Sequence, residues 1–110
     1  MNRRVFLPTN CDRFDVSLAS CYGEMEVLCS QRLNPFRVDE CVEAFSQELD
    51  EKFDPDNDFI CMTGQTLLIS IALGVAMTKF DRVNVLLYDA ISSSYKSRII
   101  TMKGNRNGKD

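Results

Sequence analysis

The sequence predicts an α/β fold, in which a small mixed β-sheet of about five strands, the central ones parallel, packs with two main helices. Two segments, residues 34–54 and 65–80, have the length and apolar spacing of helices. Short β-branched or aromatic runs precede, separate and follow them. Because strands joined through a helix run parallel, the central strands are expected to be parallel.

The first part of the chain is expected to hold two strands with a short helical turn between them. Residues 4–7 are β-branched or aromatic and precede a proline, which is typical of a strand. Residues 16–22 are expected to form a single helical turn, with Asp15 or Ser17 as its N-cap. Residues 24–29 are predicted to be the second strand.

The first long helix is predicted to open at Asn34-Pro35. Asparagine caps free N–H groups, and proline suits the first helical position. Asp54-Pro55 should end the helix, since the residue before proline is pushed out of helical geometry. Apolar residues recur at intervals of three and four, which predicts one buried face made of Val38, Cys41, Val42, Phe45, Leu49 and Phe53.

The second part of the chain predicts a strand, a buried helix and a final strand pair. Residues 58–63 form a continuous apolar run, which Gly64 interrupts. The helix at 65–80 is apolar nearly all round, so it needs cover from the sheet and from a further element. Residues 83–88 resemble an interior strand, and residues 95–102 alternate as an antiparallel edge strand would.

Residues 1–102 are expected to form a single α/β domain, and residues 103–110 a disordered polar tail. The longest apolar run is well short of the roughly twenty residues that span a bilayer, so no membrane association is expected. The cysteines are odd in number, include no C-x-x-C pair and have no histidine to complete a mixed zinc site. They predict reduced, buried thiols in a cytoplasmic protein, namely Cys11, Cys21, Cys29, Cys41 and Cys61.

The charge distribution argues against nucleic acid as a direct partner. The whole chain has a net charge of −3, but residues 5–102 carry eight basic against fifteen acidic side chains, a net charge of −7. Such a body repels phosphate backbones and anionic membranes.

No residue pattern supports catalysis, a metal or a cofactor. Histidine is absent, so the cysteines and serines lack their commonest general base. The alternating aspartates Asp54, Asp56 and Asp58 lack the glycine and glutamate that a calcium loop requires. A solvated loop between helix and strand is the expected structure there.

The turn between the predicted interior strand and the apolar helix is one candidate site. Thr63, Gly64, Gln65 and Thr66 lie where α/β sheets bind ligands, at a strand's carboxyl end and a helix N-terminus. A nucleotide or another anion is the ligand class that this position favours. The alternative is a plain strand-to-helix turn, with a permissive glycine and a threonine N-cap.

The acidic face of the first long helix is the second candidate. Neighbours three or four apart on a helix lie ~5–6 Å from each other, so a row of carboxylates there could dock a basic protein or imitate nucleic acid. The alternative is a solvated helix face. The residues of this face are Glu40, Glu43, Asp50, Glu51 and Asp54.

Two features bear on self-association. Glycine inside a helix costs ~1 kcal/mol against alanine, so Gly74 is expected to pack closely, within the fold or across a homodimer. The edge strand could also pair with a second copy, unless Lys96 and Arg98 prevent it.

Several stretches together resemble a family of small α/β proteins encoded by bacteriophages. They include residues 10–15, 22–24, 34–36, 58–64, 80–83, 86–89 and 95–99. The resemblance implies a viral accessory protein acting in the bacterial cytoplasm, and it carries no catalytic signature. The leading hypothesis is therefore a non-catalytic protein that binds a host or viral protein through the acidic helix face or the edge strand. Alternatives are a nucleotide- or anion-binding module at Thr63–Thr66 and a small virion or scaffold component.

Overall fold

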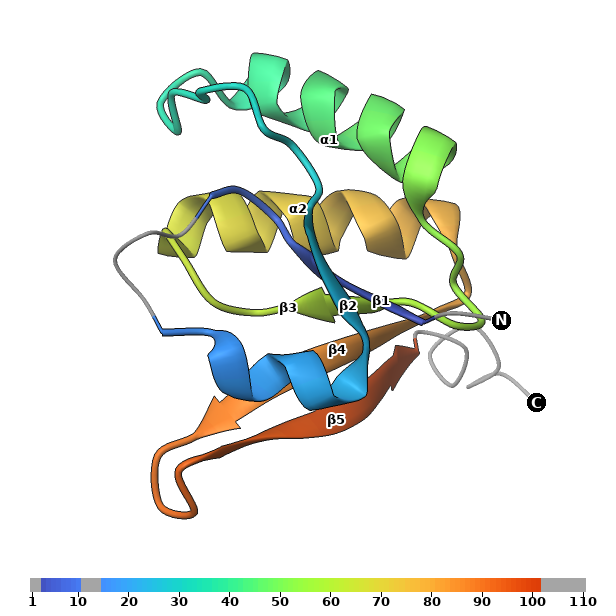
Figure 1. Ribbon diagram of the computed structural model, residues 1–110. Helices are drawn as coiled ribbons and strands as arrows, with labels where there is room; N and C mark the ends of the chain where they lie inside the picture. Colours follow the sequence, from blue (N-terminus) through green and yellow to red (C-terminus); the bar gives the residue numbers. More distant parts are fainter. Residues whose placement is uncertain (1–2, 11–14, 102–110) are drawn as a thin grey trace, which may run out of the picture.

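A computed structural model describes residues 3–10 and 15–101. One five-stranded sheet has two long helices on one face and a short 3₁₀ helix on the other (Figure 1). The disordered tail predicted at residues 103–110 lies outside the described residues. The elements are β1 (Arg4–Leu7), η1 (Ser17–Tyr22), β2 (Glu24–Val27), α1 (Val38–Lys52), β3 (Phe59–Cys61), α2 (Thr66–Lys79), β4 (Arg82–Asp89) and β5 (Ser94–Thr101).

The predicted mixed α/β sheet is confirmed. The strand order is β2-β1-β3-β4-β5. β1 pairs in parallel with β2 and β3, and β3 pairs in parallel with β4. β5 is antiparallel to β4 and forms one edge of the sheet. The chain thus crosses over three times between parallel strands, through η1, α1 and α2.

The predicted start of α1 at Asn34-Pro35 is wrong, because these residues form a separate turn. The Asn34 carbonyl accepts a hydrogen bond from the Arg37 N–H at 2.9 Å. The Asn34 side chain accepts another from the Phe36 N–H at 3.0 Å. The asparagine therefore caps this turn, and the helix begins only at Val38.

The main core lies between the sheet and the two long helices. α1 contributes Cys41, Phe45 and Leu49, all fully buried. The prediction that Val38 and Val42 are also buried is wrong, since they are 44% and 40% exposed. α1 packs on its neighbours through a narrow stripe formed by these three buried residues, and the two valines lie at the margin of that stripe.

α2 is covered as its all-apolar sequence requires. It lies between α1 and the sheet in Figure 1, and it packs against both α1 and β4. Leu68, Ala72 and Ala76 are among its buried residues. Its apolar composition thus reflects contact with two neighbours at once.

The opposite face of the sheet has a smaller core under η1. Ala19 of η1 is fully buried there with Val5 and Leu86. The Tyr22 ring meets the Phe59 ring edge-on, with centroids 5.6 Å apart. Six residues of 3₁₀ helix therefore provide the element that covers this face.

Asp58 is a buried carboxylate directly before β3, so the expectation of a solvated loop is wrong for this residue. Its side chain is 1% exposed. It accepts hydrogen bonds from the Arg4 N–H at 3.1 Å, the Arg4 guanidinium at 3.2 Å and the Asp54 N–H at 2.9 Å. The Arg4 guanidinium also donates to the Lys52 carbonyl at the end of α1. This cluster ties β1, β3 and α1 together.

Replacing Asp58 should therefore destabilise the protein far more than replacing its exposed neighbour Asp56. Asp58→Ala leaves two N–H groups without their acceptor and takes the buried carboxylate from the Arg4 guanidinium, which costs about 3–5 kcal/mol. Asp56→Ala removes only an exposed ion pair with Arg82, worth at most about 1 kcal/mol. Urea unfolding of both variants measures the difference. Equal midpoints would contradict the role given to Asp58.

No described residue packs closely against Gly74, so the expected close packing within the fold is wrong, and packing across a homodimer is the alternative that stays a prediction. It is exposed on α2, and a Cβ atom added there would meet nothing within 4 Å. Its backbone is helical, so a side chain imposes no strain.

Gly74→Ala should accordingly stabilise the monomer by ~0.5–1 kcal/mol, the difference in helix propensity. Thermal unfolding of dilute protein provides the measurement, with Ser70→Ala as a second exposed position on α2. A loss of stability at Gly74, dependent on protein concentration, would instead place this glycine in an interface.

Candidate functional site

The strand order brings the turn at Thr63–Thr66 to a special position in the sheet. β1 continues through η1 to β2 on one side, whereas β3 continues through α2 to β4 on the other side. The connections after the neighbouring strands β1 and β3 therefore leave in opposite directions. Open α/β sheets bind ligands at this reversal, at the carboxyl ends of the strands.

Thr63 is engaged with the smaller core. Its hydroxyl lies 3.0 Å from the Tyr95 hydroxyl and 3.7 Å from the Cys61 sulfur. The Tyr22 hydroxyl donates to the Tyr95 carbonyl at 2.9 Å. These bonds connect the end of β3 with β5 and η1, and they orient the Thr63 hydroxyl toward the sheet.

Gln65, and not a threonine, caps α2. Its side-chain oxygen accepts a hydrogen bond from the Leu68 N–H at 2.8 Å. The predicted threonine N-cap is wrong, because Thr63 is held by Tyr95 and Thr66 already belongs to the helix. Gly64 has a φ of 136°, a conformation that favours glycine. Gln65 and Thr66 are exposed, and Thr63 and Gly64 are half-buried.

The buried thiols are poor nucleophiles. Burial raises the pKa of Cys61, and hydrogen bonds to Thr63 and Tyr95 offset only part of this effect. Burial likewise raises the pKa of Cys29 and of Cys41. Cys21 is exposed, contrary to the expectation of a buried thiol, and Cys11 lies outside the described residues. The three buried cysteines therefore act as small apolar residues.

The structure places four of the five predicted acidic residues on α1 and one beyond it. Glu40, Glu43, Asp50 and Glu51 are exposed on the helix. Asp54 lies in the following turn, where it accepts hydrogen bonds from the Asn57 side chain at 2.8 Å and from the Asp56 N–H at 3.0 Å. These two bonds, Asn57 first, hold the pKa of Asp54 below its usual value. Asp54 thus shapes the turn.

The carboxylates of α1 differ in their partners. Glu40 pairs with Arg37 at 3.2 Å, and Asp50 pairs with Lys79 of α2 at 2.8 Å. Across the described ranges 3–10 and 15–101, no ion pair involves Asp39 or Glu43. The negative charge at the beginning of α1 is therefore only partly neutralised.

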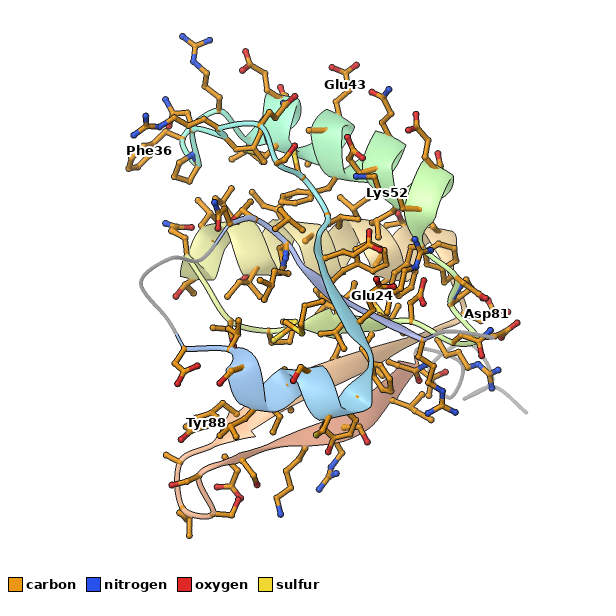
Figure 2. The ribbon with its side chains drawn as sticks, viewed as in Figure 1. Glu24, Phe36, Glu43, Lys52, Asp81 and Tyr88 are labelled. Carbon is orange, nitrogen blue, oxygen red and sulfur yellow. The ribbon has the colours of Figure 1, made fainter. Side chains whose placement is uncertain are left out.

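Exposed apolar side chains lie beside these carboxylates. Phe36, in the turn before α1, is 89% exposed, and Val38 and Val42 are partly exposed. Glu43 points away from α2 and the sheet in Figure 2, and Phe36 projects from the turn. We call the set the α1 surface; it consists of Phe36, Val38, Asp39, Glu40, Val42 and Glu43.

The sequence did not indicate the apolar part of the α1 surface. The interval of four between Val38 and Val42 continues the buried stripe, so periodicity assigned both to the core. Phe36 carries no signal of exposure, because a phenylalanine near a helix start is ordinarily buried. Only the packing of α1 on α2 reveals that these side chains face outward.

In the part of the chain that the structure describes, no three His, Cys, Asp or Glu side chains gather closely enough to hold a metal ion. No helix within those ranges is both long enough and apolar enough to cross a bilayer.

Comparison with known proteins gives one result. Residues 4–102 match the sequence model of a protein family described as Phage Pam3 gp32-like protein. No match is found among curated proteins or among solved structures.

Proposed function

The chain belongs to the Phage Pam3 gp32-like protein family, and from this premise we propose that it is a non-catalytic phage accessory protein that binds another protein through the α1 surface. The observation that carries the proposal is the exposure of Phe36, at 89%, beside two partly exposed valines and two carboxylates, Asp39 and Glu43, that form no ion pair with any described residue.

An exposed aromatic residue with apolar neighbours has the composition of a binding hot spot. Aromatic side chains contribute strongly when a partner encloses them, and surrounding polar groups exclude water from the contact. Phe36 would be the anchor, with Val38 and Val42 extending the apolar area. The partner therefore offers an apolar recess.

The charge of the α1 surface favours a basic partner. Asp39 and Glu43 attract a basic surface, which accelerates encounter and suppresses acidic competitors. We expect the partner to be a basic host or phage protein in the bacterial cytoplasm. Nucleic acid is disfavoured as a direct partner by the same charge.

Glu43→Lys should weaken capture of the partner by about tenfold at low salt, because it places like charges against each other. The matched control is Glu24→Lys, which makes the same charge change at an exposed site on β2 (Figure 2). Capture from phage-infected cells with immobilised protein, quantified by mass spectrometry over a salt series, provides the measurement. Phe36→Ala should reduce capture at every salt concentration, since its contribution is apolar.

The same set of variants can contradict the proposal. Equal loss of the captured protein with Glu43→Lys and Glu24→Lys would show that total charge, and not the α1 surface, governs binding. Unchanged capture with Phe36→Ala would remove the anchor.

A second candidate function is nucleotide or anion binding at Thr63–Thr66. What favours it is the strand order, which puts this turn at the reversal between β1 and β3. The exposed Thr66 hydroxyl and the N–H groups of the first turn of α2 would meet the anion.

If that turn binds an anion, nucleotides or inorganic phosphate should raise the melting temperature, because a ligand of the folded state stabilises it. Thr66→Asp should abolish the rise by adding a negative charge at the turn, whereas Thr78→Asp, at the other end of α2, should leave it unchanged. A flat response of the wild-type protein to all of these ligands would contradict this second function.

A further inference from the structure

The outer edge of β5 carries backbone groups that no strand among the described residues pairs with. The Leu86 carbonyl accepts a hydrogen bond from the Met62 N–H at 2.9 Å, so Leu86 directs its backbone groups away from β5. Its cross-strand partner Ser97 must then direct its own N–H and C=O outward, and alternation does the same for Ile99.

The free part of this edge is short. At one end, the Tyr95 carbonyl accepts the Tyr22 hydroxyl at 2.9 Å. In the middle, the Arg98 guanidinium folds back onto the Ser97 carbonyl at 2.6 Å. The open positions are therefore the Ser97 N–H and the backbone groups of Ile99, and the Arg98 guanidinium lies across the Ser97 carbonyl.

A hollow of about 300 Å³ adjoins the free edge. Ser97, Arg98 and Ile99 line one side of it, Phe59 and Asn84 contribute from the neighbouring strands, and Arg3 lines it from the start of β1. Ile99 is 63% exposed. Together, the edge offers backbone groups for hydrogen bonds, Ile99 offers apolar area, and the arginines offer positive charge.

Two of the cations at this hollow are not neutralised. Arg82 pairs with Asp56 at 3.0 Å. Neither Arg3 nor Arg98 forms an ion pair within the described residues. In a chain with a net charge of −3, two such arginines among the residues that line the hollow and its edge favour an anionic partner.

Like charges disfavour two of the antiparallel registers in which this edge could pair with a second copy of the chain. Antiparallel pairing of β5 with itself, centred on Ser97, would put Lys96 of each copy opposite Arg98 of the other. Centring on Arg98 would put the two Arg98 side chains opposite each other. Like charges directly opposite across strands are destabilising. Lys96 and Arg98 therefore oppose self-pairing in these registers, and the same two residues favour a partner strand with acidic side chains.

We propose that the Ser97–Ile99 edge and the adjoining hollow dock an extended acidic segment of another protein, which adds a strand to the sheet beside β5. A peptide backbone satisfies both the donors and the acceptors of the edge, which a phosphate group cannot do. Acidic side chains of the segment pair with Arg98 at the edge and with Arg3 across the hollow. This site is separate from the α1 surface and does not depend on it.

The test uses the full chain and three short synthetic peptides. In one, glutamate alternates with valine; in the second, lysine replaces glutamate; the third is the glutamate peptide with alternate backbone nitrogens methylated. Titrations followed by NMR locate binding residue by residue. The glutamate peptide should shift the amide signals of residues 95–101 with a Kd below about 1 mM, and the other two peptides should not.

Charge reversal supplies the specific control. Arg98→Glu should weaken binding of the glutamate peptide at least about tenfold and admit the lysine peptide. Arg37→Glu reverses another exposed arginine, before α1, and should leave binding unchanged. Arg3→Ala should weaken binding to a smaller extent than Arg98→Glu.

Several results would overturn the proposal. One is the absence of shifts in β5 at peptide concentrations of several millimolar. Others are equal binding of the methylated peptide, which would exclude strand addition, and tighter binding of phosphate or of a single-stranded oligonucleotide at the same residues. Self-association that Arg98→Glu changes would assign the edge to a second copy.

Discussion

The arrangement of β1, β3 and the end of α1 depends on the hydrogen bonds and the ion pair between the buried carboxylate of Asp58 and Arg4. Asp58 lies directly before β3 and accepts both the backbone N–H and the guanidinium of Arg4 at the start of β1. The same guanidinium reaches the last carbonyl of α1. Residues 54 positions apart in the chain are thereby fixed at one point. The cluster thus fixes the C-terminal end of α1 against the starts of β1 and β3.

Most of the architecture could be predicted from local patterns. The apolar run of α2, the stripe of Cys41, Phe45 and Leu49 and the short apolar strands all reflect periodicity that burial imposes on nearby residues. Asn34, Asp58 and Gln65 show where this reasoning stops. In each of them, the hydrogen-bond partner of the side chain is set by a particular turn or by a distant strand. Composition and spacing therefore cannot tell which partner the side chain has, or whether it is solvated.

The candidate surfaces also differ in how far the sequence could predict them. Helical spacing correctly grouped Glu40, Glu43, Asp50 and Glu51, because neighbours on one helix share a face whatever the rest of the fold does. Phe36 required the packing of α1 to be known. The hollow beside β5 required more still, since Arg3 and Arg98 come from opposite ends of the sequence and meet only across the assembled sheet.

The unequal cover of the two sheet faces has a consequence for the motions of the protein. One face lies beneath two helices of 15 and 14 residues, while the other is covered by six residues of 3₁₀ helix. Segments with few buried contacts open at a lower free energy than the global transition. We therefore expect η1 to open at a lower free energy than the larger core, and such an opening would break the hydrogen bond from the Tyr22 hydroxyl to the Tyr95 carbonyl beside the free edge of β5. Opening of this six-residue segment would then change how much of the β5 edge is accessible to a partner.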